Sequence, residues 1–199
     1  MLKRIAFYLV WLVLAVPAWA QQSATKSYRG LPVSISLFTE SISLPGFRGI
    51  FANPGIKVGT EFYYRNRTRS QLLQTVNAGY YYHRNLHHGM FINSEFTYRR
   101  YFGNFYAEGG IGGGYLHLYS LIPMYEKNGD SYSKASPHVH KFMPSLGGGV
   151  GYRCGKALIG VRYEVFGEFP VLSNEVPLLP HKALCLSVRF NMPSSGAGR

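Results

Sequence analysis

Charged side chains occur at alternate positions within several apolar, aromatic-rich stretches of the chain. In the stretch 182–192, which reads KALCLSVRFNM, Arg189 stands between Val188 and Phe190. Alternation with a period of two is typical of a β-strand with one apolar and one polar face. We therefore expect the charged side chains to share one face of a sheet, where Arg and Lys can pair with carboxylates. The expected network is Lys57, Glu61, Glu95, Arg99, Glu108, Arg162, Glu164 and Arg189.

Histidines are the other residues that could do chemistry, since imidazoles that converge can bind a transition metal or haem. His138 and His140 are two positions apart, so in an extended segment they point the same way, and they are the candidates for a metal site. The alternative is that polar loops simply tolerate histidine. All seven are expected at one end of the fold, in loops or near a strand end: His83, His87, His88, His117, His138, His140 and His181.

Eight alternating segments can position these side chains. The connections at 65–69, 102–104 and 154–156 are short, while those at the other end are longer, the longest being the polar loop 121–141. Short turns that alternate with longer loops, and an even number of strands from eight upward, are typical of membrane barrels. The predicted fold is all-β, an eight-stranded antiparallel up-and-down transmembrane β-barrel. The predicted strands are 31–43, 54–64, 70–82, 90–101, 105–120, 142–153, 157–167 and 182–192.

The beginning of the chain has the pattern of a secretory signal peptide: Lys3 and Arg4, an apolar run over 5–16, and Ala18-Trp19-Ala20. The predicted organisation is a signal peptide 1–20, a periplasmic lead-in 21–30, a barrel 31–192 and a tail 193–199. Export places the barrel in the cell outer membrane. Although disulfides form in that compartment, Cys154 and Cys185 fall on strands that are not adjacent, and we expect two unpaired thiols.

Composition favours a strand-rich protein over one that crosses a membrane with helices. The chain has 16 Tyr, 13 Phe and 23 Gly, only 15% of its residues are charged, and no apolar run after the signal peptide is long enough for a membrane helix. Aromatic residues favour strands, and glycine suits tight turns and crowded interiors. The net charge is +12. Because the chain is exported and has no nucleic-acid-binding module, we expect lipid phosphates rather than nucleic acid as the neighbouring anions.

The direction in which the charged face points distinguishes a membrane barrel from a soluble one. In a membrane barrel the charges face the lumen, and an eight-stranded lumen is just wide enough for its side chains, so no large pore is expected. In a soluble secreted, lipocalin-like binding barrel the apolar alternates would form the core instead. The tyrosines of the apolar face favour the membrane barrel, since they fall near strand ends, as interfacial aromatic belts do: Tyr64, Tyr80, Tyr82, Tyr98 and Tyr152.

A signal peptide, alternating strands, short and long connections and an aromatic residue in the last strand together resemble the small outer-membrane β-barrels. This class includes the transmembrane domain of outer membrane protein A and many Bacteroidota barrels. The resemblance implies outer-membrane lipid and lipopolysaccharide as partners, a structural or interaction role through the external loops, and no cofactor. It also implies that Phe190 is read by the barrel-assembly machinery during insertion, although Met192 and the segment 193–199 follow it here.

Some barrels of this class are enzymes that modify lipid A as deacylases or acyltransferases, and the resemblance leaves this alternative open. Such an activity needs a nucleophile, a histidine and an acid near the outer leaflet. The sequence matches no such motif, and we assign no catalytic residue. The glycine-rich EGGIGGG over 108–114 is not a phosphate-binding loop, because no lysine and helix follow it. The residues that could serve are Ser120, Ser136, His117, His138, His140, Glu126 and Asp130.

Overall fold

The computed structural model describes residues 30–42, 53–84, 86–123, 125–128, 131–169 and 179–193. The predicted signal peptide lies outside the described residues. The predicted lead-in and tail also lie outside them, except for Gly30 and Pro193, which begin the first barrel strand and end the last one. Within the described part, no helix is long and apolar enough to cross a membrane.

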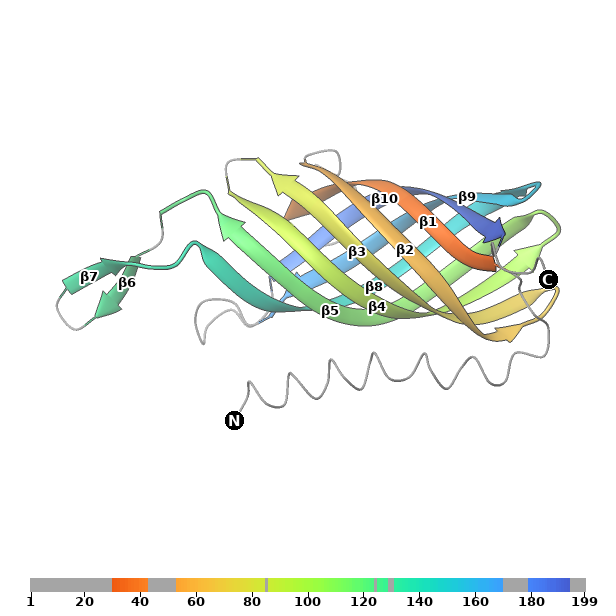
Figure 1. The fold of residues 1–199 in the computed structure, drawn as a ribbon, viewed down its shortest axis with the longest axis horizontal. Helices are drawn as coiled ribbons and strands as arrows, with labels where there is room; N and C mark the ends of the chain where they lie inside the picture. Colours follow the sequence, from red (N-terminus) through yellow and green to blue (C-terminus); the bar gives the residue numbers. More distant parts are fainter. Residues whose placement is uncertain are drawn as a thin grey trace, which may run out of the picture.

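Eight antiparallel strands form a closed barrel in the order β1-β10-β9-β8-β5-β4-β3-β2, which confirms the predicted fold class (Figure 1). The closing pair joins the segment with the clearest alternation, β10, to β1 along the whole length of β1. The strands are β1 (Gly30–Ile42), β2 (Asn53–Asn66), β3 (Ser70–His83), β4 (His87–Phe102), β5 (Phe105–Ser120), β8 (His138–Cys154), β9 (Ala157–Glu168) and β10 (Leu179–Pro193).

The connections from β2 to β3, β4 to β5, and β8 to β9 are short, and they define the short-turn end of the barrel. At the opposite end the prediction of longer connections is wrong for β3 and β4, because β3 ends at His83 and β4 begins at His87. Gly103 and Gly155 have positive φ angles, 67° and 60°, in two-residue turns. Tight hairpins need such angles, which side chains with a Cβ rarely adopt, and a Cβ would meet nothing at either position. Glycine is therefore required there by backbone conformation and not by lack of space.

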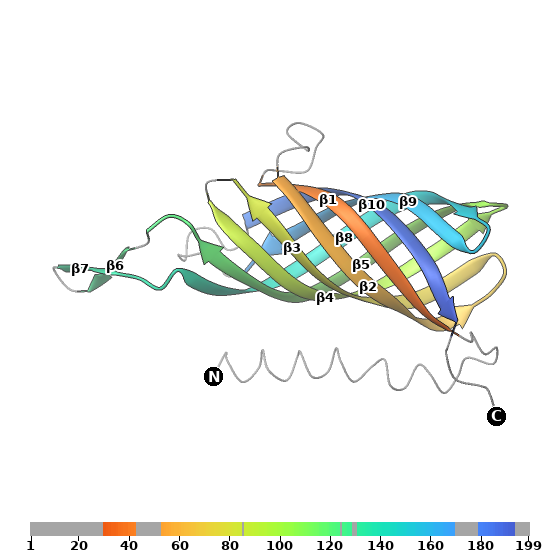
Figure 2. The same cartoon turned by 45° about the horizontal axis from the view of Figure 1, so that its top comes forward.

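At the opposite, long-loop end the strands extend further than the sequence predicted. β4 begins at His87 and β8 at His138, and β10 begins at Leu179. The histidines placed in loops therefore lie in strands, where alternation fixes the face of each. The predicted loop 121–141 also contains a two-stranded hairpin, β6 (Tyr125–Asn128) with β7 (Ser131–Lys134), which projects beyond the rim (Figures 1 and 2). Polar composition had indicated an irregular loop.

The barrel has an apolar exterior and a polar interior. Mid-strand aliphatic side chains such as Leu186, which is 53% exposed, and Ile111, which is 64% exposed, point outward, whereas Ser187 and Glu108 are buried. A soluble barrel requires the reverse, with its apolar alternates inside. Both cysteines are free thiols, Cys154 exposed in β8 and Cys185 buried in β10, as expected from their separation.

Candidate functional site

The interior next to the short-turn end is occupied by charged side chains, and Glu108 of β5 is their hub. One of its carboxylate oxygens lies 2.9 Å from Nε of Arg99, and the other lies 2.5 Å from Nη2 of Arg189 and 3.4 Å from Nη1 of Arg162. Arg99 is fully buried and also donates to Glu61, with 2.6 Å between Nη2 and Oε1. These contacts join β2, β4, β5, β9 and β10 across the lumen.

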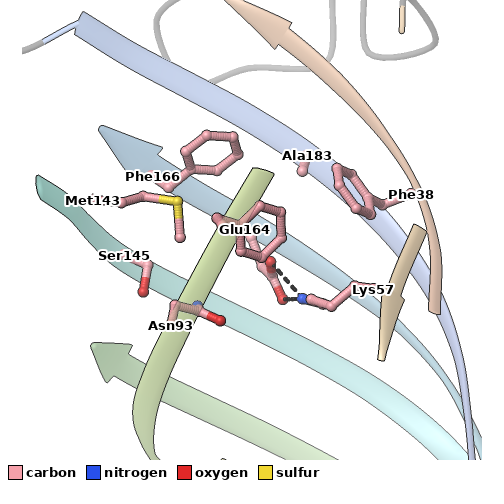
Figure 3. Close-up of a pocket in the computed structure, with 9 residues that line it drawn as sticks. Phe38, Lys57, Asn93, Met143, Ser145, Glu164, Phe166 and Ala183 are labelled. Carbon is pink, nitrogen blue, oxygen red and sulfur yellow. Dashed lines mark hydrogen bonds and ion pairs between the residues drawn. The ribbon is translucent and has the colours of Figure 1, made fainter. Parts of the chain in front are cut away.

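A second layer of charge lies above the first, further from the short turns. Arg162 Nη2 is 2.6 Å from Oε2 of Glu95, and its Nε is 2.9 Å from Oε1 of Glu164. Glu164 also accepts two hydrogen bonds from Nζ of Lys57, of 2.6 and 2.9 Å (Figure 3). All eight residues proposed for the network are buried and paired with one another. Four cations face four carboxylates, so the group carries no net charge.

Glycines on the inner wall make room for these side chains. A Cβ at Gly147 of β8 would lie 2.9 Å from both Nε and Nη2 of Arg162 and 2.9 Å from Cγ of Glu164. A Cβ at Gly112 of β5 would lie 2.7 Å from Cγ of Glu95. The glycine-rich stretches of β5 and β8 thus form a part of the inner wall without side chains, and the large side chains of β4 and β9 lie against it.

An apolar layer lies next to the charged layers, on the side of the long-loop end, and it was not predicted from the sequence. Its members come from the polar-facing positions of their strands, where a charged lumen was expected. A water-sized space lies between Phe38, Met143 and Phe166 of this layer and the Lys57–Glu164 pair, with Asn93 and Ser145 at its side (Figure 3). The layer consists of Phe38, Tyr81, Phe91, Leu116, Leu118, Met143, Phe166, Ala183 and Cys185.

Histidines and carboxylates close the lumen at the long-loop end. His181 is fully buried between two glutamates, with its Nδ1 2.7 Å from Glu40 and its Nε2 2.9 Å from Glu168. Glu40 also lies 2.7 Å from Nδ1 of His83, and His87 lies 4.0 Å from Glu168. The interior histidines had been expected in loops. The two glutamates were missed because alternation alone marks Glu40 as one more inward residue, and Glu168 had been placed in a loop.

The remaining histidines face outward from the barrel wall at the same end. His117 of β5 lies directly opposite His140 of β8, with 3.3 Å between their Nδ1 atoms, and its Nε2 is 3.2 Å from Nδ1 of His138. His140 also contacts the hydroxyl of Tyr115. The candidate ligands His138 and His140 thus meet opposite nitrogens of His117. In the described part of the chain, no three His, Cys, Asp or Glu side chains are grouped to hold one metal ion.

The hydroxyl groups of the two candidate nucleophiles form hydrogen bonds with backbone groups. Ser120 donates to the carbonyl oxygen of Ile122 at 2.8 Å, and the Ser136 hydroxyl oxygen accepts from the amide of His138 at 3.2 Å. The side chains of Glu126 and Asp130 lie outside the described residues. The described geometry therefore adds no support to the lipid A enzyme hypothesis.

Comparison with known proteins finds similarity in structure alone. No family model matches the chain, and no curated protein matches its sequence. Neisserial surface protein A has a similar structure, with a TM-score of 0.50 at 15% identity over 81% of this chain and 96% of that one. The outer membrane enzyme PagL gives 0.48 at 16% identity, covering 81% and 99%. Ail of Yersinia pestis gives 0.47 at 13% identity, covering 82% and 99%. The closed eight-stranded barrel and its similarity to Neisserial surface protein A confirm the resemblance to small outer-membrane barrels at the level of fold.

Proposed function

We propose that this chain is an integral outer-membrane barrel with a structural or interaction role, exposed to the outside through its long-loop end. The apolar outer wall carries this proposal. Exposed aliphatic or aromatic residues lie on every barrel strand of the described chain, and the carboxylates of those strands are buried inside. So large an apolar surface is not stable in water, whereas lipid chains cover it without cost.

Strand lengths support a membrane position. The barrel strands have between 12 and 17 residues, and a tilted membrane strand needs about 9 to 11. The predicted signal peptide provides export, and the basic balance of the chain suits a surface of lipid phosphates. We propose outer-membrane lipid and lipopolysaccharide as neighbours, and the barrel-assembly machinery as the partner during insertion.

We further propose that the lumen does not conduct. Four layers fill it in sequence: the two layers of paired charges, the apolar cluster and the histidine–glutamate group. Purified barrel reconstituted into a planar bilayer should therefore give no steady single-channel current. A stable conductance that survives removal of the β6–β7 hairpin would show that the lumen is open and contradict the proposal.

A charged substitution on the outer wall tests whether that wall faces lipid or water. Replacing Ile111, in the middle of β5, with Arg should lower the free energy of unfolding in lipid by about 2 to 4 kcal/mol, the usual cost of arginine near the bilayer midplane. Replacing Tyr132, which is 71% exposed on the projecting hairpin, with Arg serves as the control and should change little. Urea titration in vesicles measures both. Equal stability of the two variants would favour a soluble barrel.

The proposal is tested directly by fractionating cells that express the full chain. We expect the protein in the outer-membrane fraction, with faster migration in detergent gels before boiling than after it, as a folded barrel keeps its compact shape. Recovery from the soluble periplasm, with the same migration before and after boiling, would overturn the proposal.

A further inference from the structure

In the described part of the chain, the exposed charges at the short-turn end of the barrel are all positive. The residues from 62 to 94 and from 96 to 107 contain no acid, nor do those from 131 to 163. Of the carboxylates nearest these turns, Glu61 and Glu108 are buried in the lumen and paired with arginines. The exposed cations at the short-turn end of the described chain form what we call the basic rim: Arg65, Arg67, Arg69, Arg100, Arg153 and Lys156.

The three turns that bear the basic rim adjoin one another. The amide of Tyr101 donates to the carbonyl oxygen of Arg69 at 2.9 Å, and the amide of Arg153 donates to that of Asn104 at 2.8 Å. The guanidinium of Arg153 lies 4.3 Å from the ring centroid of Tyr101. Like charges on adjacent turns repel one another, and the sequence of these turns contains no carboxylate that would offset the repulsion. An anion from outside the chain would stabilise this end.

Exposed aromatic residues indicate where the membrane interface lies relative to the basic rim. Tyr98, Phe102, Phe105 and Tyr152 point outward near the short turns, and such belts mark the boundary between hydrocarbon and headgroups. Arg100 alternates with two of them on the outer wall of β4, and its guanidinium is 5.6 Å from the ring centroid of Phe102. The basic rim is therefore at the depth of lipid phosphates.

We propose that the basic rim binds the headgroups of anionic phospholipids in the leaflet that faces the short turns. The proposal rests on the membrane position proposed above. Guanidinium groups bind phosphate oxygens through charge-assisted, often bidentate hydrogen bonds. The cations stand on three protruding turns and on the outer wall, which suits many separate monoanionic headgroups around a rim. At the long-loop end the sequence mixes acids such as Glu126 and Asp130 with its bases, so the preference belongs to one end only.

Lipid retained by the purified barrel tests the proposal. Barrel is taken from mixed micelles with equal amounts of phosphatidylglycerol and phosphatidylcholine, and the bound lipids are counted by native mass spectrometry. We expect the wild type to retain phosphatidylglycerol preferentially, and less so as salt rises. Each cation near an anionic surface contributes about a fivefold change in binding. The variant R65Q/R67Q/R69Q/R153Q/K156Q removes five of these cations, and its preference for phosphatidylglycerol should fall by at least about fivefold, the effect of a single cation.

The control variant R84Q/K134Q removes two exposed cations from the other end and should retain the wild-type preference. Equal retention of both lipids by the wild type would overturn the proposal. So would sedimentation with purified peptidoglycan that depends on the basic rim while lipid retention does not, because the partner would then be that polymer. A wild type that never forms the heat-modifiable barrel in any lipid would instead contradict the membrane position itself.

Discussion

Replacing Glu108 with Gln should lower the free energy of unfolding of the barrel by about 3 to 5 kcal/mol, the usual cost of removing one partner from a buried ion pair. The glutamine keeps the shape of the side chain but leaves Arg99, Arg162 and Arg189 with one negative charge fewer between them. Because these cations are buried, water cannot replace the lost carboxylate. Urea titration in vesicles, followed by the migration of unboiled protein, measures the loss.

Two further variants show whether charge is the cause. Removing a cation as well, in E108Q/R189Q, restores neutrality and should recover part of the stability, since residues in one network are not additive. Replacing the exposed Arg100 with Gln should cost no more than about 0.5 kcal/mol. If E108Q were as stable as R100Q, the interior charges would not form a coupled network.

Replacing Gly147 with Val should lower the free energy of unfolding by about 3 kcal/mol, at the upper end of the usual cost of overpacking. The new side chain would enter the space of the Arg162 guanidinium, which its carboxylate partners hold in place. Valine otherwise favours strands, so the loss would run against its intrinsic preference. The same urea titration measures it.

The adjacent residue is the matched control. Gly148 faces outward, and the nearest atom to a Cβ there is the carbonyl oxygen of Glu108, at an ordinary 3.7 Å. Replacing Gly148 with Val should leave stability unchanged within about 0.5 kcal/mol or raise it slightly, since it adds apolar surface that lipid covers. Similar losses at both glycines would mean that strand flexibility, and not space in the lumen, requires glycine here.

The alternation of side chains was enough to predict the strands, their order around the barrel and the inward direction of the charged residues. A period of two fixes the face of each residue once a strand exists, so Arg162 and Glu164 follow from β9 alone. Strand ends were less predictable. The polar sequence around His138 and His140 indicates a loop. These residues nevertheless extend β8, because β5 pairs with them through backbone hydrogen bonds.

What the sequence could not provide are contacts that depend on side chains from several strands. Phe38 lies on the same face of β1 as Ser34 and Ser36, and nothing local distinguishes a lumenal phenylalanine from one that faces lipid. It becomes part of an interior cluster because β3, β4 and β9 bring Tyr81, Phe91 and Phe166 to the same level. The meeting of His181 with Glu40 and Glu168 likewise joins residues far apart in the chain.

Fluorescence of single tryptophans tests most directly whether the outer wall faces lipid. Both native tryptophans, Trp11 and Trp19, fall within the predicted signal peptide, so the mature barrel offers no background. Three variants each introduce one probe: I111W on the outer wall, F91W in the interior cluster and Y132W on the hairpin. In vesicles with brominated lipid chains, I111W should be strongly quenched, and the other two should not. Equal quenching of I111W and F91W, or none at I111W, would contradict a barrel whose apolar face is turned to the membrane.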